Sequence, residues 1–316
     1  MIQHVRPVDL QASMVQGAEI LVRWVEVLSK EPLAGEIDFS VEMAWWQNIA
    51  SEFTVKTRLM WQDGWFRDYD ALTKEWSTQQ DTMHLAPVFC GAAGWGHKEQ
   101  LRPYFAQPPM HSSGWASLSW PPVVMALVGS ASVADLSVEA AELSYRFIDA
   151  SYRSIDSRQP DQHGGLPGVT REYRQTVSVG KWGAIEYVNA GIEGYGWGAL
   201  SIHLLIRYLL GLQEEEINQM TIAPLLPQAL RRVGATYGVE SVAWGKYRIA
   251  IECVVLDAES YTVRLRCGQP KQEVPDGMVE GEPVQYSYIV QACEWKAKWG
   301  EKRTLLLPDL TMAAKK

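Results

Sequence analysis

The stretch 171–212 holds the residues best suited to chemistry. Glu172-Tyr173 comes first, and Glu186-Tyr187 follows after a glycine-bearing segment that we expect to be a loop. The aromatic turn Gly194–Trp197 then leads into an apolar helix that ends at Gly211. Carboxylates move protons, and flat rings pack on the apolar faces of sugars. The pattern favours carbohydrate chemistry, although two ordinary surface glutamates in a solvated loop would fit it equally well.

This stretch resembles the C-terminal catalytic segment of trehalases and related inverting α-glucosidases, which fold as a six-hairpin α/α toroid. That family has a Glu-Lys-Tyr, a glycine-rich run, a Glu-Tyr and a Gly-Phe-Gly-Trp turn in this order. The resemblance places Glu172 at the first acid, the family's general base, and Glu186 at the second acid, which contacts substrate. Here Tyr173 follows its glutamate directly, and the glycine run is thinner.

Three further segments extend the resemblance over about residues 5–212, the latter half of the family's catalytic domain. Pro7–Leu10 reads Pro-Val-Asp-Leu, which opens a helix in trehalases. Gly64–Asp70 resembles the family's Gly-Trp-Tyr-x-Asp-Tyr-Asp. Gly114–Trp120 resembles part of the family's pocket wall, although the Gln-Trp-Asp that precedes it there is absent. The resemblance implies these substrate-contacting side chains besides Glu186: Trp115, Trp120, Tyr187 and Trp197.

The remaining acids and the loop histidine have simpler interpretations. Asp9 stands where a helix N-cap is expected, and this role is favoured over a catalytic one. Asp68 and Asp70 could bind substrate, but acids in loops are more often solvated or cap a helix, so we leave them out of the site. His111 is expected to be structural. Two tryptophans of the same loop as these aspartates could line a pocket wall, namely Trp61 and Trp65.

Composition narrows the class of protein. The chain has 316 residues and a formal net charge of -8, without a basic stripe, which argues against nucleic acid as a partner. It contains 14 Trp but only 6 Phe, a bias that favours ring stacking with a polar handle. No run is long enough to cross a membrane, and no signal peptide is visible, so we expect a cytoplasmic protein.

The four cysteines show no spacing typical of a zinc site or a redox motif. Three of them fall among apolar neighbours in the C-terminal region, so buried free thiols are expected. The sequence implies no cofactor and no metal site. The positions are Cys90, Cys253, Cys267 and Cys293.

Hydrophobic periodicity predicts helices over the first two thirds of the chain. Residues 10–28 and 39–60 should form one antiparallel helical hairpin. Residues 84–90 should form a short helix, another helix should start near 123, and 136–155 should be an amphipathic helix. With the resemblance, this predicts a partial (α/α)6 toroid over residues 1–220.

After Leu212 the pattern changes to short strands. The charge run Glu214–Glu216 should be a solvated helix end, and Pro224–Pro227 signals a boundary. The alternation then predicts strands at 247–256, 261–266, 284–291 and 304–307. The predicted fold class is therefore mainly α with a C-terminal β domain, a small β-sandwich over residues 221–316.

Two functional hypotheses follow. In the first, the chain is the C-terminal part of an inverting glycoside hydrolase that cleaves an α-linked glucoside or oligosaccharide. The family's general acid is an Asp upstream of Pro-Val-Asp-Leu, so it is expected on an upstream segment or a second polypeptide that completes the toroid. In the second hypothesis, the chain is a non-catalytic relative that binds carbohydrate or another subunit.

Overall fold

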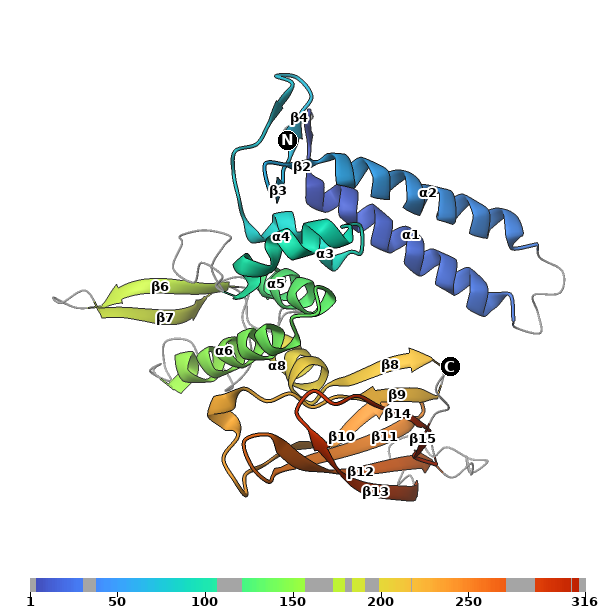
Figure 1. Cartoon of the computed structure of the whole chain (residues 1–316), viewed down its shortest axis with the longest axis vertical. Helices are drawn as coiled ribbons and strands as arrows, with labels where there is room; N and C mark the ends of the chain where they lie inside the picture. Colours follow the sequence, from blue (N-terminus) through green and yellow to red (C-terminus); the bar gives the residue numbers. More distant parts are fainter. Residues whose placement is uncertain are drawn as a thin grey trace, which may run out of the picture. The chain divides into compact units, whose positions relative to one another are not determined.

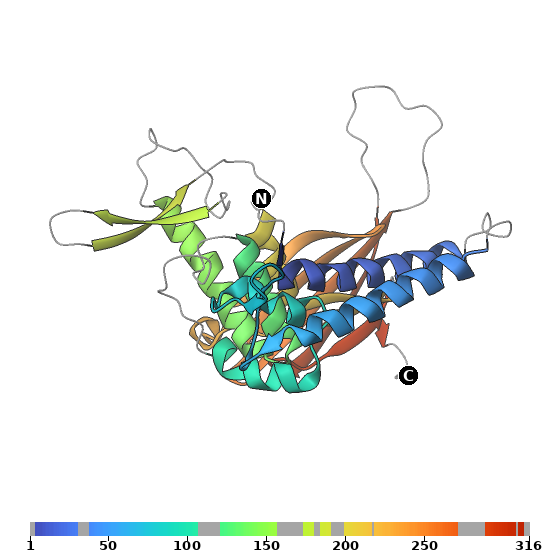
Figure 2. The same ribbon diagram turned by 90° about the horizontal axis from the view of Figure 1, so that it is seen from above.

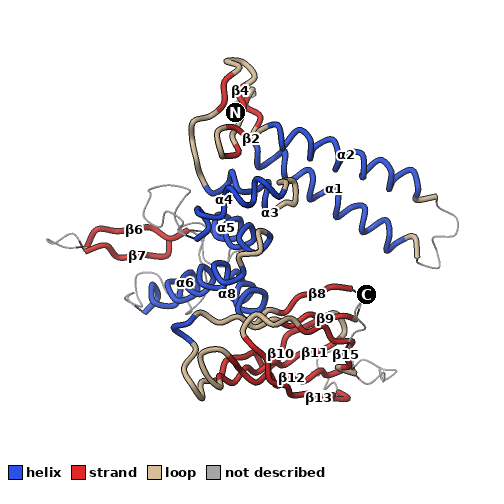
Figure 3. Tube along the Cα trace, in the orientation of Figure 1, coloured by secondary structure: helices blue, strands red, loops and turns tan. Residues whose placement is uncertain are grey.

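The computed structural model describes residues 4–30, 38–106, 121–156, 173–179, 184–190, 199–216, 218–270, 288–307 and 309–312. The chain forms two compact units (Figure 1). The first comprises Met1–Leu143 and Asp149–Leu200, and the second comprises Ser144–Ile148 and Ser201–Lys316. Helices predominate in the first unit and strands in the second (Figure 3).

The first unit begins with the predicted helical hairpin. Helix α1 (Val8–Leu28) and helix α2 (Ser40–Leu59) lie side by side and run in opposite directions (Figure 2). One face of α1 is buried at intervals of three and four residues, as a 3.6-residue period requires. The buried side chains on this face are Val8, Ala12, Val15, Ala18 and Val25. The prediction of a hairpin over 10–28 and 39–60 is confirmed.

The start of α1 corrects the prediction that Asp9 is its N-cap. The N-cap residue is Pro7, which has extended dihedrals and no side-chain hydrogen bond. Asp9 lies inside the first turn, where its Oδ1 accepts from the N–H of Leu10, at 2.8 Å. The N–H of Val8 donates instead to Asp68 Oδ1, at 2.8 Å. The N-terminus of α1 is therefore capped by Asp68, a loop residue 60 positions from Val8 in the sequence.

Short strands bring that acid to the helix. Strand β1 (Val5–Arg6) pairs with β4 (Tyr69–Asp70), and β4 pairs with β5 (Glu75–Trp76). A separate two-stranded sheet joins β2 (Trp61–Gln62) to β3 (Trp65–Phe66). The segment 61–70, which was expected to be a plain loop, thus contains three strands.

The next helices are short and well buried. A 3-10 turn η2 (Thr82–Leu85) continues into α3 (Ala86–Phe89), which confirms the predicted short helix. They are followed by α4 (Trp95–Ala106), α5 (Pro121–Val133) and α6 (Ser137–Asp156). Helix α5 is apolar and buried almost all round, and its Gly129 has no room for a side chain because Phe89 lies against it.

Tyr173 and the Glu186-Tyr187 pair lie on two strands that pair with each other as a β-hairpin. Strands β6 (Tyr173–Val179) and β7 (Ala184–Ala190) are antiparallel, with Val177 opposite Glu186. The expectation of a loop was therefore wrong for these two strands. The β-branched residues of β6, such as Thr176 and Val177, favour a strand.

The second unit contains two four-stranded antiparallel sheets. Helix α8 (Leu200–Leu204) begins in the first unit and continues as a π-helical turn, η4 (Leu205–Leu209), which leads to the strands. One sheet has the order β10-β11-β12-β13, and the other has the order β15-β14-β9-β8. Their bounds are β8 Leu212–Glu216, β9 Gln219–Ile222, β10 Thr236–Trp244, β11 Tyr247–Val255, β12 Ser260–Pro270, β13 Tyr288–Lys298, β14 Arg303–Leu306 and β15 Thr311–Met312.

Buried side chains from both sheets form one hydrophobic cluster. Met220 and Ile222 of β9 belong to it together with Ile249 of β11 and Leu265 of β12. Along β11 the residues with odd numbers from Tyr247 are buried and those between them are not, so the strand covers the core with one face. Interior packing of this kind gives the unit its own core.

Several strand predictions are confirmed and other details are wrong. Strands β11 and β14 match the predicted 247–256 and 304–307 to within one residue. The ends of two other strands differ, because β12 extends to Pro270 rather than stopping at residue 266, and β13 extends to Lys298 rather than stopping at residue 291. Residues 284–287 of that last prediction lie outside the described residues. The charge run Glu214–Glu216 is not a helix end but part of β8, which is held in the sheet by pairing with β9. The division of the chain predicted between residues 220 and 221 stays a prediction. The toroid and the β-sandwich stay predictions.

Candidate functional site

Most residues of the predicted site lie outside the described ranges. These are Glu172, Trp115, Trp120 and Trp197, and His111 is outside them as well. The backbones of Glu186 and Tyr187 lie in β7. Their partners across the hairpin are Val177 and Thr176.

The hairpin fixes how far apart its two ends are. Tyr173, which follows Glu172 in sequence, pairs with Ala190, whereas Glu186 pairs with Val177. These two residue pairs are four residues apart along each strand, which corresponds to roughly 13 Å at about 3.3 Å per residue. The backbone of Glu186 is therefore well separated from the start of β6, although both positions belong to one hairpin.

One connected set of described side chains in the first unit surrounds His84. His84 is 4 % exposed and its Nε2 lies 3.5 Å from Asp68 Oδ2. Its backbone N–H and that of Met83 donate to Asp81 Oδ1, which caps the 3-10 turn. The same Asp68 carboxylate accepts from the N–H of Val8. One aspartate thus holds a helix start and a buried histidine together.

Electrostatics favour the charged form of this pair. Burial by itself lowers the pKa of His84, but the hydrogen bond to Asp68 and the charges of Asp81, Asp68 and Asp9 outweigh it, and the pKa is raised. Burial raises the pKa of Asp68, but the contacts to His84 and to the N–H of Val8 outweigh it, and the pKa is lowered. Opposite charges so close together stabilise each other's ionised forms.

The other ring nitrogen of His84 has a different environment. Nδ1 is buried and has no hydrogen-bond partner among the described residues. A buried polar atom is normally paired with protein or with ordered water. The Asp68–His84 pair can hold a proton, and its contacts fix the loop that carries Asp68 against α1 and η2.

The tryptophans expected at a pocket wall have different surroundings. Trp65 is 6 % exposed and packs against Tyr104, with ring centroids 4.9 Å apart. Little of its ring surface is therefore accessible to a sugar. Trp61 is partly exposed and stacks on His97 at 4.5 Å. Trp65 is thus a core residue, whereas Trp61 keeps some accessible surface.

Sequence reasoning missed His84 as the centre of this arrangement. The segment was interpreted only as a short helix, because its apolar residues dominate the pattern. Those neighbours were the available signal: Leu85, Ala86 and Val88 are buried, and a histidine among them needs a polar partner. Asp68, left out of the site as a capping acid, supplies that partner.

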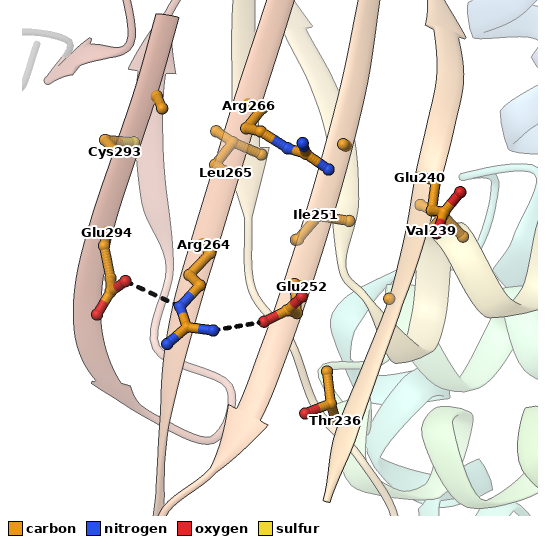
Figure 4. A pocket seen from close by; sticks show the side chains of 13 residues that line it. Thr236, Val239, Glu240, Ile251, Glu252, Arg264, Leu265, Arg266, Cys293 and Glu294 are labelled. Carbon is orange, nitrogen blue, oxygen red and sulfur yellow. Dashed lines mark hydrogen bonds and ion pairs between the residues drawn. The ribbon is translucent and has the colours of Figure 1, made fainter.

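The second unit has a polar hollow of about 690 Å³ on the β10–β13 sheet (Figure 4). Arg264 stands between two glutamates directly across the strands, and donates to Glu294 at 2.9 Å and to Glu252 at 2.8 Å. Its charge is therefore neutralised within one row of the sheet. No aromatic side chain lines this hollow among the described residues, so it offers no surface there on which a sugar could stack.

Among the described residues, no group of three or more His, Cys, Asp or Glu side chains could hold a metal ion. Within the same ranges, no helix combines the length and the apolar character that a membrane crossing needs. The four cysteines are free, and all but Cys293 are buried.

No family model and no curated protein matches the chain. Solved structures resemble it in part. They include an uncharacterized conserved protein from Thermus thermophilus (15% identity, TM-score 0.46, covering 64% of this chain and 47% of that one). They also include a GH63 mannosylglycerate hydrolase from the same organism (16%, 0.44, 64% and 46%) and neutral trehalase from Saccharomyces cerevisiae (17%, 0.44, 65% and 38%).

The part of each of these structures that the chain matches is less than half of that structure's length. Two of the three are glycoside hydrolases, and the mannosylglycerate hydrolase has also been solved with glucose bound. At these identities and TM-scores the similarity assigns neither a family nor an activity to the chain.

Proposed function

We propose that the chain is part of an inverting glycoside hydrolase that cleaves an α-linked glucoside. Glu172 activates the attacking water as general base, and Glu186 holds a sugar hydroxyl. Inversion also needs a carboxylic acid about 6.5–9.5 Å from the base to protonate the leaving oxygen. That acid comes from a segment or polypeptide that completes the site. The pocket wall is formed by the side chains of Trp115, Trp120, Tyr187 and Trp197.

One observation supports this proposal most directly. The resemblance to trehalases rests on separate motifs, and two of them meet in the structure. The Pro-Val-Asp-Leu segment donates from the Val8 N–H to Asp68 of the Gly-Trp-Phe-Arg-Asp-Tyr-Asp segment, and Arg6 pairs with Tyr69 beside it. Motifs that occur together in one family and also contact each other are more specific than either motif alone.

The test is hydrolysis by an assembly that contains this chain. Glucose release from trehalose, maltose and longer α-glucans would be followed for the unmodified chain, for Glu172→Gln and for Glu186→Gln. Loss of the general base should lower turnover by about 10²–10⁴, the usual contribution of acid–base help. Glu186→Gln should mainly raise KM, because the proposed role of Glu186 is to bind substrate.

The matched control is Glu259→Gln, which changes an exposed glutamate in a turn of the second unit. It should leave kcat and KM unchanged. Normal turnover in Glu172→Gln would remove Glu172 from the role of base. An assembly that shows no release from any of these substrates, but binds them, would favour the non-catalytic alternative.

The non-catalytic hypothesis has a second form, in which the chain contacts another subunit. A separate observation supports this form. Helix α1 exposes apolar side chains outside its buried face, including Leu10 at 57 %, Trp24 at 63 % and Leu28 at 49 % exposure. Large exposed apolar surfaces usually mark an interaction site. Light scattering over a range of concentrations should show association, and Trp24→Glu should reduce it. A monomer at all concentrations would count against this second function.

A further inference from the structure

A hollow of about 820 Å³ lies within the first unit, between the short sheet β1–β4–β5 and the C-terminal part of α2. The sheet contributes Arg6, Tyr69 and Trp76 to its lining. The helix contributes Phe53 and Lys56 among others. A volume of this size is typical of small-molecule sites.

The sheet wall is a single row of side chains. Arg6 lies directly opposite Tyr69, and Tyr69 lies directly opposite Trp76. Residues opposite each other on neighbouring strands share a face, so these three side chains line the hollow together. The rings of Tyr69 and Trp76 are in contact, with centroids 4.7 Å apart and planes inclined by 51°.

The neighbouring row of side chains in the same sheet includes two acids, and it points away from the hollow. Asp70 pairs with Val5 and with Glu75, one position along each strand. Because successive residues of a strand point to opposite faces, these two carboxylates face away from the hollow. The sheet therefore places its rings and its cation on one side and its acids on the other.

The lining of the hollow is positively charged in a chain whose net charge is -8. Among the described residues, Arg6, Lys56 and Lys74 line it, and no Asp or Glu does. Lys56 pairs with Glu52 on the exposed side of α2. Arg6 and Lys74 are exposed and have no ion-pair partner in the part of the chain that the structure describes. Two cations are thus available to an anion.

A buried acceptor completes the lining. Gln11 of α1 lines the hollow, and its Oε1 is buried with no hydrogen-bond partner in the described ranges. An unsatisfied buried carbonyl is unfavourable, and a hydroxyl group of a ligand would satisfy it. The hollow thus combines two rings, two available cations and one acceptor.

We propose that this hollow binds an anionic sugar, a pyranose that carries one carboxylate or phosphate. The apolar face of the sugar packs on Tyr69 and Trp76. The anion is bound by Arg6 and Lys74, and a sugar hydroxyl donates to Gln11. This site goes beyond the proposed hydrolytic function, because it uses none of the residues assigned to that reaction.

Calorimetric titration of the full chain tests the proposal. Glucuronate and glucose 6-phosphate are the probes, and glucose and inorganic phosphate are the comparison ligands. At least one probe should bind about ten-fold or more tightly than either comparison ligand, since a charged hydrogen bond contributes that much or more. The tighter probe identifies the anion. Raising the salt concentration should weaken binding, because the cations are exposed.

Variants locate the site. Arg6→Gln, Lys74→Gln and Trp76→Ala should each weaken binding of the tighter probe by about ten-fold. The matched controls are Arg23→Gln in α1 and Trp95→Ala in α4, which change exposed residues that do not line the hollow, and both variants should bind the probe normally. Lys74→Gln changes an exposed turn residue, so it tests the site even if another variant fails to fold.

Four results would overturn the proposal. Glucose could bind as tightly as the tighter probe, or inorganic phosphate could bind as tightly as that probe. The controls could lose as much affinity as the lining variants, or neither probe could bind at all. None of these results depends on glucose release, so they are separate from the test of hydrolysis.

Discussion

The α1–α2 hairpin and the sheets of the second unit bury their apolar residues to different degrees. Thr57 is the one buried residue of α2, a helix of 20 residues, and Trp45 is 52 % exposed. In β11 and β12, by contrast, alternate residues are buried in a shared core, and Ile249 and Leu265 are 0 % exposed. Apolar residues therefore indicate burial reliably only where they recur with the period of the helix or strand, so that all of them fall on the one face that packs against the core.

The largest expected effect comes from the core of the sheets. Leu265→Ala should lower the free energy of unfolding by about 2–5 kcal/mol, because it removes buried methyl groups and leaves a cavity. Urea unfolding of the full chain would measure this loss. Leu28→Ala, at an exposed position of α1, should change stability by less than about 0.5 kcal/mol. Equal losses at the two sites would mean that the exposed face of α1 is covered in solution.

A smaller effect is expected at the polar centre of the first unit. Asp68→Asn keeps an acceptor for the Val8 N–H but removes the charge beside His84. It should cost about 1–3 kcal/mol at pH 5, as expected for a hydrogen bond to a charged group. Urea unfolding at pH 5 and pH 9 would compare the variant with the unmodified chain.

The pH dependence follows from the directions of the two pKa shifts. The folded pKa of His84 is raised, so its contribution is complete below its ordinary value of 6.5 and is lost as the pH rises through the folded pKa. The folded pKa of Asp68 is lowered, so its contribution is complete above 3.8 and is lost as the pH falls through the folded pKa. The pair therefore stabilises most between about pH 4 and pH 6.5.

The control for this experiment is Asp257→Asn in the second unit. Asp257 is exposed and accepts from Glu259 and Ser260 in a turn, without a histidine partner among the described residues. Its effect on stability should be the same at pH 5 and pH 9. If the cost of Asp68→Asn is also the same at both values, His84 is not charged in the folded protein.

The smallest effect should be a gain. Gly17 lies in the middle of α1, and a Cβ atom there would meet nothing within 4 Å. Gly17→Ala should therefore stabilise the protein by about 0.5–1 kcal/mol, because alanine loses less backbone freedom in a helix. Gly129→Ala is the contrast, since the ring of Phe89 occupies the space of its Cβ. A thermal melt of each variant would give the sign, and a loss at Gly17 would indicate a hidden contact on this face.

Local periodicity predicted several of the longer helices and several strands of the second unit. The alternation from Tyr247 to Leu256 and the helical spacing from Leu10 to Leu28 are strong signals, because burial on one face selects them. The β6–β7 hairpin was missed because its glycines and its resemblance to a family loop outweighed its β-branched residues. Glu214–Glu216 was missed because charge alone does not exclude a strand whose pairing is provided by β9.

The arrangement around the candidate sites could be predicted only in part. Aspartates near a helix start were recognised as capping acids, but the choice between Asp9 and Asp68 depends on the pairing of β1 with β4. Such long-range pairing leaves no periodic trace in either segment. The row Arg6–Tyr69–Trp76 has the same origin, since its members come from three short strands that no periodic pattern marks.

The connectivity of the second unit has a consequence for the order in which it forms. Within the described residues, strands β10 to β13 pair only with sequence neighbours, so these contacts need only the closure of the intervening turns and loops. Strand β9 pairs with its sequence neighbour β8 and also with β14, about 80 residues further on, with Ile222 opposite Arg303. Closing a chain segment of that length costs on the order of 4 kcal/mol of entropy before any contact is gained. The β10–β13 sheet should therefore assemble first. The pairing of β9 with β14 should follow as a late step of folding.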